Sequence, residues 1–247
     1  MNIDKRIAVI TGGSSGMGRA CTAALLKRGA RVMVWDRQAS SLDCESVLCD
    51  VTSSESIEHA LQTTLHRLGT PQICINCAGV APAARVLGKQ GVMSLEAFTQ
   101  VIQINLMGTF NVIRLVADAM TRIEGIAEGM ERGVIINTAS IAAFEGQIGQ
   151  SAYSASKGGI VGLTLPLARE FAQYGIRVNT IAPGLVATPL LQGMPEAVQE
   201  SLAASVPFPK RFAEPEEFAA LAVHFIENSY MNGAVVRLDG ALRMQPK

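Results

Sequence analysis

A tyrosine and a lysine stand four residues apart in the segment 151–159, as Tyr153 and Lys157. Side chains at this spacing share one face of a helix. A phenol has a reference pKa of about 10, and a nearby cation favours the phenolate and lowers that pKa. The pair therefore predicts a proton donor and acceptor that works near neutral pH, although an isolated Tyr/Lys pair is more often an ordinary surface contact.

Two further polar residues support a catalytic interpretation of this pair. Ser140 follows the apolar run of a predicted strand, 133–139, where its hydroxyl could hydrogen-bond a reacting oxygen or simply cap the strand. Asn105 lies among apolar residues within a predicted helix, 94–123. Asparagine is unfavourable inside a helix, so Asn105 is expected to have a buried polar role.

A glycine-rich turn, 11–18, follows a predicted strand at 6–11 and opens a predicted helix at 16–28. Glycine lets the backbone approach a pyrophosphate closely, and a helix N-terminus offers free N–H groups. In this strand-turn-helix context the turn predicts a dinucleotide site. Asp36, just after the next strand, favours NAD over NADP because its carboxylate accepts ribose hydroxyls and repels a phosphate. Arg37 is the opposing signal, since it could pair with that phosphate.

The same turn also fits a hydrolase pattern, with Ser14 between Gly12 and Gly16 as a nucleophile. Such a serine needs a histidine, and His59, His66 and His224 stand on predicted helices in unsuitable surroundings. Cys74 and Cys77 form a C-x-x-C, which could be a redox or metal pair. Residues three apart on a strand point to opposite faces, so we expect core cysteines and no metal site.

Strand and helix patterns alternate along the chain, with strands at 6–11, 31–35, 46–49, 72–76, 133–139, 176–182 and 234–238. This alternation predicts a single α/β domain, residues 1–247, with a doubly wound, seven-stranded parallel sheet of the Rossmann type and helices on both faces. Two long connections, 80–93 and 184–213, leave carboxyl ends of strands, where such sheets bind ligands. We expect the second to form a mobile substrate lid.

Composition narrows the class of protein. The 247 residues are 49% hydrophobic and carry 21 basic and 21 acidic side chains, which excludes a disordered chain and argues against nucleic-acid or membrane-surface partners. No apolar run is long enough to cross a bilayer. The N-terminus leaves no room for a signal peptide, so we expect a cytoplasmic protein, or a mitochondrial-matrix protein whose presequence has been removed.

Taken together, these motifs resemble the classical short-chain dehydrogenase/reductase family along essentially the whole chain. The matching pieces are TGGSSGMG at 11–18, Asp50-Val51, NCAG at 76–79, Asn105, Ser140, YSASK at 153–157, Asn179, and Pro183-Gly184 with Thr188. One departure is Cys77, where the family usually has asparagine. The stretches 105–117, 132–169, 206–209 and 232–246 are most similar to family members that act on 3-hydroxyacyl-CoA or hydroxysteroids.

The resemblance implies roles for individual residues. Tyr153 would be the general acid/base, with its pKa lowered by Lys157 and a cationic nicotinamide; Ser140 would position the substrate oxygen and Asn105 would hold a water linking Lys157 to solvent. The implied dinucleotide contacts are Gly12, Ser14, Ser15, Gly16, Met17, Gly18, Asp36, Asp50, Val51, Asn76, Ala78, Gly79, Tyr153, Lys157, Pro183, Gly184, Val186 and Thr188.

The implied reaction is NAD-dependent interconversion of 3-hydroxyacyl-CoA and 3-oxoacyl-CoA by a homotetramer. Gln147 is a possible polar contact to the substrate, Leu190, Leu191 and Met194 suit an acyl chain, and Arg85 and Lys89 are candidates for CoA phosphates. Alternatives on the same scaffold are a 3-oxoacyl-carrier-protein reductase, which Asp36 disfavours, and a hydroxysteroid or other secondary-alcohol dehydrogenase. A non-catalytic dinucleotide-binding regulator is the remaining alternative.

Overall fold

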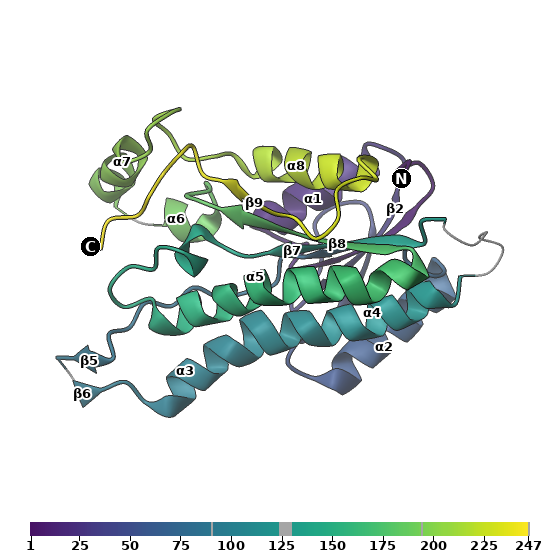
Figure 1. Cartoon of the computed structure of the whole chain (residues 1–247), viewed down its shortest axis with the longest axis horizontal. Coiled ribbons are helices and arrows are strands. Elements are labelled where there is room, and N and C mark those ends of the chain that lie inside the picture. The colour runs from purple at the N-terminus through teal and green to yellow at the C-terminus, as the bar shows by residue number, and fades with distance from the viewer. Residues whose placement is uncertain (90, 124–129, 194, 247) are drawn as a thin grey trace.

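The computed structural model describes residues 1–89, 91–123, 130–193 and 195–246. Strands and helices alternate along most of the chain, as predicted (Figure 1). The elements of the first half are β1 (Ile7–Thr11), α1 (Gly16–Leu26), β2 (Arg31–Asp36), β3 (Glu45–Leu48), α2 (Ser54–Arg67) and β4 (Ile73–Asn76). The later ones include α3 (Leu95–Ile102), α4 (Thr109–Thr121), β7 (Gly133–Thr138), α5 (Ser151–Phe171), β8 (Ile176–Pro183), α8 (Pro215–Glu227) and β9 (Val235–Leu238).

Seven of the described strands form one sheet in the order β3-β2-β1-β4-β7-β8-β9, and every neighbouring pair is parallel. The chain runs outward from β1 to β3, then crosses back to β4 and continues in the other direction. The predicted doubly wound sheet is therefore confirmed. The strand order reverses between β1 and β4, and such sheets bind ligands at this place. The last residues of the two strands, Thr11 and Asn76, are paired there.

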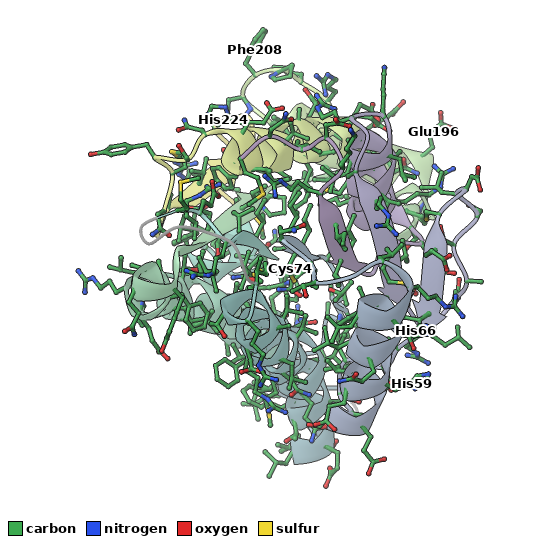
Figure 2. The ribbon with its side chains drawn as sticks, turned by 90° about the vertical axis from the view of Figure 1, so that its right-hand side faces the viewer. His59, His66, Cys74, Glu196, Phe208 and His224 are labelled. Atoms are coloured by element: carbon green, nitrogen blue, oxygen red, sulfur yellow. The ribbon has the colours of Figure 1, made fainter. Side chains whose placement is uncertain are left out.

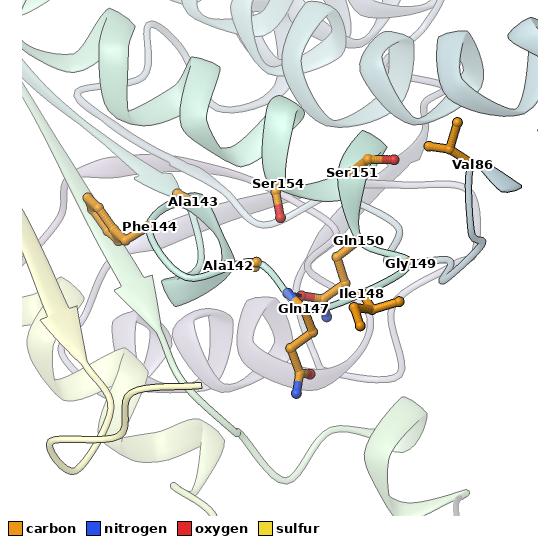
Figure 3. Close-up of a pocket in the computed structure, with 11 residues that line it drawn as sticks. Val86, Ala142, Ala143, Phe144, Gln147, Ile148, Gly149, Gln150, Ser151 and Ser154 are labelled. Carbon is orange, nitrogen blue, oxygen red and sulfur yellow. Dashed lines mark hydrogen bonds between the residues drawn. The ribbon is translucent and has the colours of Figure 1, made fainter. Parts of the chain in front are cut away.

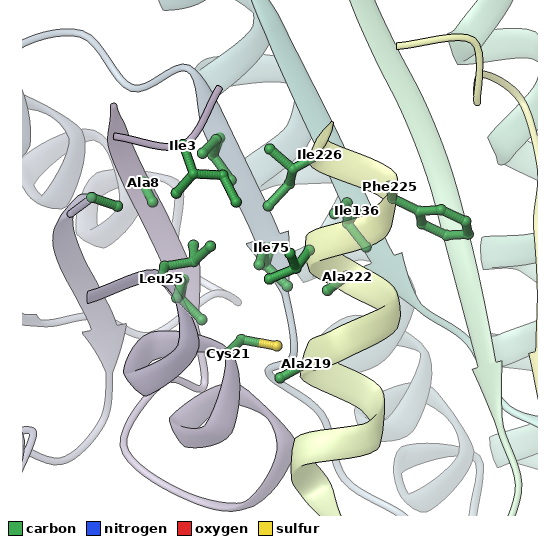
Figure 4. Packing of buried hydrophobic residues seen from close by; sticks show 14 of the residues in the cluster. Ile3, Ala8, Cys21, Leu25, Ile75, Ile136, Ala219, Ala222, Phe225 and Ile226 are labelled. Atoms are coloured by element: carbon green, nitrogen blue, oxygen red, sulfur yellow. The ribbon is translucent and has the colours of Figure 1, made fainter. Parts of the chain in front are cut away.

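The central strands are buried on both faces because each face is covered by helices. One apolar cluster joins the sheet to α1 and α8, with Leu25, Ala222 and Phe225 among its members (Figure 4). A second joins the opposite face to α2, α4 and α5, and it contains Trp35, whose indole N–H donates to Thr64 Oγ1 at 3.0 Å. Almost continuous apolar strands such as β1 and β7 are what this double burial requires.

The predicted helix caps are present. The Ser53 hydroxyl accepts from Ser56 N–H at 3.2 Å and the Ser94 hydroxyl accepts from Ala97 N–H at 3.2 Å. Gly29 follows α1 with a φ of +82°, as expected of a residue that ends a helix. None of the helices in the described part of the chain is long and apolar enough to cross a membrane.

Three segments differ from the sequence prediction. The helix expected over 94–123 is interrupted by a π-helical turn, η1 (Gln103–Gly108), between α3 and α4. The connection at 80–93 contains a small antiparallel hairpin of β5 (Leu87–Gly88) and β6 (Gly91–Val92). The connection at 184–213 contains two short helices, α6 (Pro189–Gln192) and α7 (Glu196–Ala204), which lie with the chain's C-terminus at the carboxyl edge of the sheet (Figure 1).

Candidate active site

Three of the predicted catalytic residues meet at the carboxyl end of β7. Ser140 lies just beyond that strand and caps the short helix η2 (Ile141–Ala143), while Tyr153 and Lys157 lie in the first two turns of α5. The Ser140 hydroxyl accepts from Ala142 N–H at 3.1 Å and lies near enough to the Tyr153 phenol to lower the pKa of that phenol. Lys157 Nζ donates to the Thr138 carbonyl at 2.7 Å and lies 5.9 Å from the Tyr153 ring centroid. Two hydroxyls thus lie near a fixed, buried ammonium group.

Burial shifts the pKa of both titratable groups in this cluster toward their neutral forms. The Tyr153 pKa is raised above 10 by burial, and Ser140 only partly opposes that rise. The expected lowering is therefore wrong for the protein's own residues, because Lys157 is too far away to outweigh the lost solvation. Burial also lowers the Lys157 pKa to about 8. Any lowering of the phenol pKa must come from a cationic ligand beside it.

Asn105 has the buried polar role that its position predicts, and it lies in the π-helical turn η1. Its side-chain oxygen accepts from Val80 N–H at 2.8 Å, and its amide nitrogen donates to the Val80 carbonyl at 2.9 Å and to Ser156 Oγ at 3.0 Å. Ser156 in turn donates to the Tyr153 carbonyl at 2.7 Å. Asn105 therefore joins the turn after β4 to the catalytic helix. Its implied water-holding role stays a prediction.

The glycine turn is so tight that side chains would overlap the protein's own backbone. A Cβ on Gly12 would lie 2.8 Å from Ala78 N, and one on Gly18 would overlap the Gly12 carbonyl oxygen. The turn leads directly into α1, whose first residues are Gly16, Met17 and Gly18. Glycine is therefore needed for internal packing at these positions, in addition to the predicted approach of a pyrophosphate.

Asp36 ends β2 directly beside this turn. Its carboxylate accepts from Ser14 N–H at 3.0 Å and from Gln38 N–H at 3.1 Å. Arg37 is exposed and lies close enough to Asp50 to lower the pKa of that carboxyl, after the larger effect of hydrogen bonds from Thr52. The carboxylate of Asp36 thus lies beside the glycine turn, while Arg37 interacts electrostatically with Asp50.

The other predicted dinucleotide contacts lie at the start of α1 or just beyond the carboxyl ends of β3, β4 and β8. Asn76 is buried and donates to Asn137 Oδ1 at 2.9 Å, and Gly79 faces Lys157, whose Nζ would lie 3.7 Å from an added Cβ. The Val51 side chain packs in the core against Gly108, and its implied contact with an adenine stays a prediction. The remaining ones are distributed as follows: Ser15 is exposed at the start of α1, Ala78 follows β4, Pro183 ends β8, and Gly184, Val186 and Thr188 lead into α6.

A cavity of about 450 Å³ is walled mainly by the loop between Ser140 and α5, together with Val86 and Ser154 (Figure 3). Gln147 contributes to this wall, as predicted for a substrate contact, but its amide also donates to the Gln245 carbonyl at 3.1 Å. Ser154 lines the cavity too, and its hydroxyl is buried without a hydrogen-bond partner.

The remaining substrate candidates are less closely placed. Leu190 and Leu191 lie on α6, where the Leu190 side chain is outside the described structure, and Met194 falls outside the described residues. Arg85 and Lys89 are exposed on either side of β5. Val86, next to Arg85, lines the cavity.

Comparison with known proteins identifies the family. The short chain dehydrogenase family profile matches residues 6–199. The chain belongs to the short-chain dehydrogenase family. It is 52% identical to human 3-hydroxyacyl-CoA dehydrogenase type-2, over 97% of this chain and 96% of that protein. It is 31% identical to 3-oxoacyl-[acyl-carrier-protein] reductase FabG of Thermotoga maritima, over 98% of this chain and 99% of that protein.

A solved structure agrees with this assignment. The crystal structure of 3-hydroxyacyl-CoA dehydrogenase type-2 from Mycobacterium avium superposes with a TM-score of 0.92, at 39% identity, over 98% of each chain. The protein is therefore an oxidoreductase of the short-chain dehydrogenase family, acting on CH–OH donors with a nicotinamide dinucleotide. The site fits this cofactor, because the glycine turn leads into the N-terminus of α1 and the Asp36 carboxylate lies beside that turn.

The hydrolase alternative is wrong for this short-chain dehydrogenase. The Ser14 hydroxyl donates to the Gln38 carbonyl at 2.9 Å. The histidines are exposed and far from it, with His59 and His66 on α2 and His224 on α8 (Figure 2).

The C-x-x-C pair behaves as core cysteines of the sheet. Cys74 packs into the α2/α4/α5 cluster and Cys77 against the α1/α8 cluster, so their side chains lie on opposite faces. Cys77 instead contacts Cys21 of α1, whose hydrogen bond lowers the Cys77 pKa, and it accepts from Thr138 Oγ1 at 3.5 Å. No cluster of three metal-binding side chains occurs within the described residues.

Several functional residues of this short-chain dehydrogenase were missed from the sequence. Thr138 contributes a backbone carbonyl and Ser156 a hydroxyl that organise the catalytic helix. Ser156 stands within the YSASK segment, so its closeness to Tyr153 was a usable signal. Thr138 acts through its main chain, which its residue type does not predict.

Proposed function

We propose that this protein catalyses NAD-dependent interconversion of 3-hydroxyacyl-CoA and 3-oxoacyl-CoA. The observation that carries the proposal is the neighbouring pair of hydroxyls, Ser140 and Tyr153, with the buried Lys157 next to them at the carboxyl edge of the sheet. Such a pair binds one oxygen of a secondary alcohol from two sides. Nothing else among the described residues unites a proton acceptor, a fixed cation and the glycine turn.

The chain's residues supply binding and proton transfer. The substrate hydroxyl lies between Ser140 and Tyr153, so that Ser140 orients the oxygen and the Tyr153 oxygen takes its proton. Lys157, held at Thr138, places a positive charge near the Tyr153 ring and adds to the stabilisation that a cationic nicotinamide gives a phenolate. The bound dinucleotide supplies the hydride acceptor. For reduction, Tyr153 returns the proton to the carbonyl oxygen.

The preference for NAD rests on Asp36. Its carboxylate keeps accepting capacity on both oxygens after the bonds from Ser14 and Gln38, which suits the two hydroxyls of a ribose. A phosphate on that ribose would meet a carboxylate at close range, and like charges repel strongly there. Arg37 lies near Asp50, which weakens its pairing with such a phosphate.

The substrate class is supported by the relatives and by the cavity. Proteins about half identical to this chain are named for action on 3-hydroxyacyl-CoA. The cavity wall combines apolar side chains, including Phe144 and Ile148, with Gln147 and Gln150. Arg85 and Lys89 beside its rim are suited to the phosphates of CoA.

The test is a panel of oxidation assays followed through NADH formation. 3-Hydroxyacyl-CoAs of graded chain length are compared with a hydroxysteroid and a 3-hydroxyacyl carrier protein, each with NAD and with NADP. We expect the highest kcat/KM for an acyl-CoA with NAD. A higher kcat/KM for the steroid or the carrier-protein substrate would refute the proposed substrate, and a preference for NADP would refute the proposed cofactor.

Reduction of 3-oxoacyl carrier proteins is the second candidate function. It is favoured by the relative from Thermotoga maritima at 31% identity, whose name states that activity. Asp36 argues against it because this reduction commonly draws on NADPH. The carrier-protein arm of the panel, run with NADPH in the reducing direction, separates the two functions.

We also propose that the enzyme is a homotetramer. Large apolar side chains are exposed along neighbouring helices, among them Leu95 on α3, Phe110 on α4 and Leu165 on α5. Apolar surface of this kind is typical of protein interfaces. Light scattering coupled to size-exclusion chromatography measures the mass directly, and a monomeric mass would refute this proposal.

A further inference from the structure

The chain after β9 returns across the carboxyl edge of the sheet and covers the loop that connects Ser140 to the catalytic helix (Figure 1). We call residues 239–246 the C-terminal tail and residues 144–150 the connecting loop. The loop joins the two catalytic hydroxyls, since Ser140 precedes it and Tyr153 follows it. It also forms most of the wall of the 450 Å³ cavity (Figure 3). Any group that fixes this loop therefore affects both the reacting hydroxyls and the substrate space.

Glu145, in the connecting loop, is held by two arginines from far along the chain. Arg237 of β9 donates to both of its carboxylate oxygens, at 2.8 and 3.0 Å. Arg243 of the C-terminal tail adds an ion pair at 3.2 Å, and Met244 N–H donates at 3.4 Å. The side chains of Glu145 and Arg237 are only 24% and 22% exposed. Water therefore screens this pair much less than an exposed ion pair.

The arginines are themselves fixed by their neighbours. Arg237 Nε donates to Asp239 at 2.6 Å, and Arg243 lies 3.3 Å from the same carboxylate. Arg237 also stands over the Phe144 ring, 5.4 Å from its centroid. Because Asp239 is bonded to both arginines, it fixes the orientation of their guanidinium groups toward Glu145. We call Glu145, Arg237, Asp239 and Arg243 the clamp.

Backbone contacts extend the attachment of the C-terminal tail along the connecting loop. Ile148 N–H donates to the Pro246 carbonyl at 3.0 Å, and the Gln147 amide donates to the Gln245 carbonyl at 3.1 Å. Both loop residues line the cavity. The tail is thus the outer support of the cavity wall.

The same tail is also packed against the predicted lid. Leu242 is buried in a small apolar cluster with Ile141 and Val206, and Leu185 packs against it. Ile141 is the residue after Ser140, and Val206 follows α7. Gly240 approaches so closely that a Cβ there would lie 2.6 Å from Val206. One segment therefore contacts the residue next to the catalytic serine, the connecting loop and the lid.

We propose that Glu145 is a positioning residue, and that the clamp holds the connecting loop at the distance that admits the acyl chain and so sets the enzyme's chain-length preference. This proposal rests on the proposed acyl-CoA function. The carboxylate of Glu145 acts through Gln147, Ile148 and Gly149 of the cavity wall. It does not touch the reacting oxygen itself.

The central variant is Glu145→Gln, which keeps the size of the side chain and removes its charge. An amide presents N–H groups to one of the arginine donors, so the bidentate pair is lost. We expect KM for the preferred acyl-CoA to rise about tenfold, as for loss of one charge-assisted hydrogen bond. We expect kcat to change less than about threefold and the Kd of NADH to stay unchanged. The difference in kcat/KM between short and long acyl chains should shrink.

Arg243→Gln is the milder second variant. Its side chain is 59% exposed, so the substitution removes one cation from the clamp without leaving a buried charge. We expect the same pattern with a smaller rise in KM. The matched control is Glu45→Gln, which breaks the Arg67–Glu45 ion pair at 2.8 Å on the outer strand β3. This control should leave KM and chain-length preference unchanged.

Two outcomes overturn the proposal. In one, Glu145→Gln and Arg243→Gln keep the chain-length profile of the wild type, as the control does. In the other, KM, NADH affinity and melting temperature all worsen together in both variants, which indicates a general structural role. Failure of the proposed function is distinguished by the wild type: if it oxidises no acyl-CoA, the same variants are measured with the secondary alcohol that it does oxidise.

Discussion

Around Gly12 and Gly18, the carboxyl edge of the sheet is held by backbone packed on backbone, whereas around Glu145 and Arg237 it is held by charged side chains. The glycine turn has no space for a Cβ against Ala78 or its own carbonyls. The connecting loop is held in place by the Glu145 carboxylate, which lies between two guanidinium groups. The close backbone packing of the glycine turn permits one backbone conformation. The position of the connecting loop depends on a few charged side chains, so single polar substitutions can change it. We infer that the glycine turn, which we call the cofactor end, tolerates little change in sequence. The connecting loop, which we call the substrate end, can change its shape and so its substrate preference through single substitutions.

The largest effect is expected on kcat, from substitution of Tyr153, which lies between the cofactor end and the substrate end. Tyr153→Phe removes the only atom that takes the substrate proton in the proposed mechanism and leaves the ring in place. General acid/base groups contribute about 10²–10⁴-fold to rate, so kcat should fall by about that factor. The Kd of NADH, measured by fluorescence, should stay unchanged. Tyr174→Phe, on an exposed tyrosine, is the control, and retention of activity in Tyr153→Phe would refute the mechanism.

At the cofactor end, Gly18→Ala should damage both fold and binding. The added methyl group would overlap the Gly12 carbonyl, and overpacking of this kind costs about 1–3 kcal/mol of unfolding free energy. We expect a lower melting temperature and a loss of NADH affinity.

Gly162→Ala on α5 is the matched control, since a Cβ there meets nothing within 4 Å. Alanine is favoured over glycine inside a helix by about 1 kcal/mol, so this variant should be unchanged or more stable. If Gly18→Ala and Gly162→Ala had the same melting temperature and the same NADH affinity, the claim that close backbone packing fixes the glycine turn would be refuted.

Asp36→Ala tests the charge at the ribose. Removal of the carboxylate removes an acceptor for ribose hydroxyls and the repulsion of a phosphate. We expect the ratio of kcat/KM for NAD to that for NADP to fall by about tenfold or more. Asp118→Asn, on the exposed face of α4, should leave the ratio unchanged. An unaltered ratio in Asp36→Ala would mean that residues other than Asp36 determine the preference for NAD over NADP.

The last prediction concerns the stability of the protein and Lys157, whose folded pKa of about 8 lies below its reference value of 10.5. Between those two values the unfolded chain binds a proton that the folded chain has released. The unfolding free energy should therefore rise with pH from about 8 to 10.5, by up to about 1.4 kcal/mol per pH unit. Below pH 8 this contribution is constant and unfavourable.

Lys157→Met removes that titration. Denaturant unfolding of both proteins without added cofactor, at pH 7.5 and 9.5, measures the difference. The stability of the wild type relative to the variant should increase with pH. The opposite slope would mean that the ammonium group is stabilised by its carbonyl contact more than it is destabilised by burial.

Local patterns predicted most of the fold. The apolar runs at β1 and β7, the serine caps of α2 and α3 and Gly29 after α1 are all effects of neighbouring residues. The spacing of Tyr153 and Lys157 likewise put them on one helical face. These expectations succeeded because the interactions involved span only a few residues.

Other features had no local signal. The π-helical turn places Asn105 where its amide reaches the Val80 backbone, 25 residues earlier in the chain. The upward shift of the Tyr153 pKa reflects burial, which a sequence does not display. Cys77 meets Cys21 only because α1 packs over the end of β4.

The sequence by itself determined the parallel α/β sheet, the glycine turn and the shared helical face of Tyr153 and Lys157, because each depends on spacing within one element or at one strand end. Only the tertiary structure decided how the substrate end is held. Glu145 and Arg237 are separated by 92 residues, and neither has a neighbour that predicts the other. Long-range ion pairs depend on where strands and loops come to lie after the sheet has formed, and that placement is a property of the packed core as a whole.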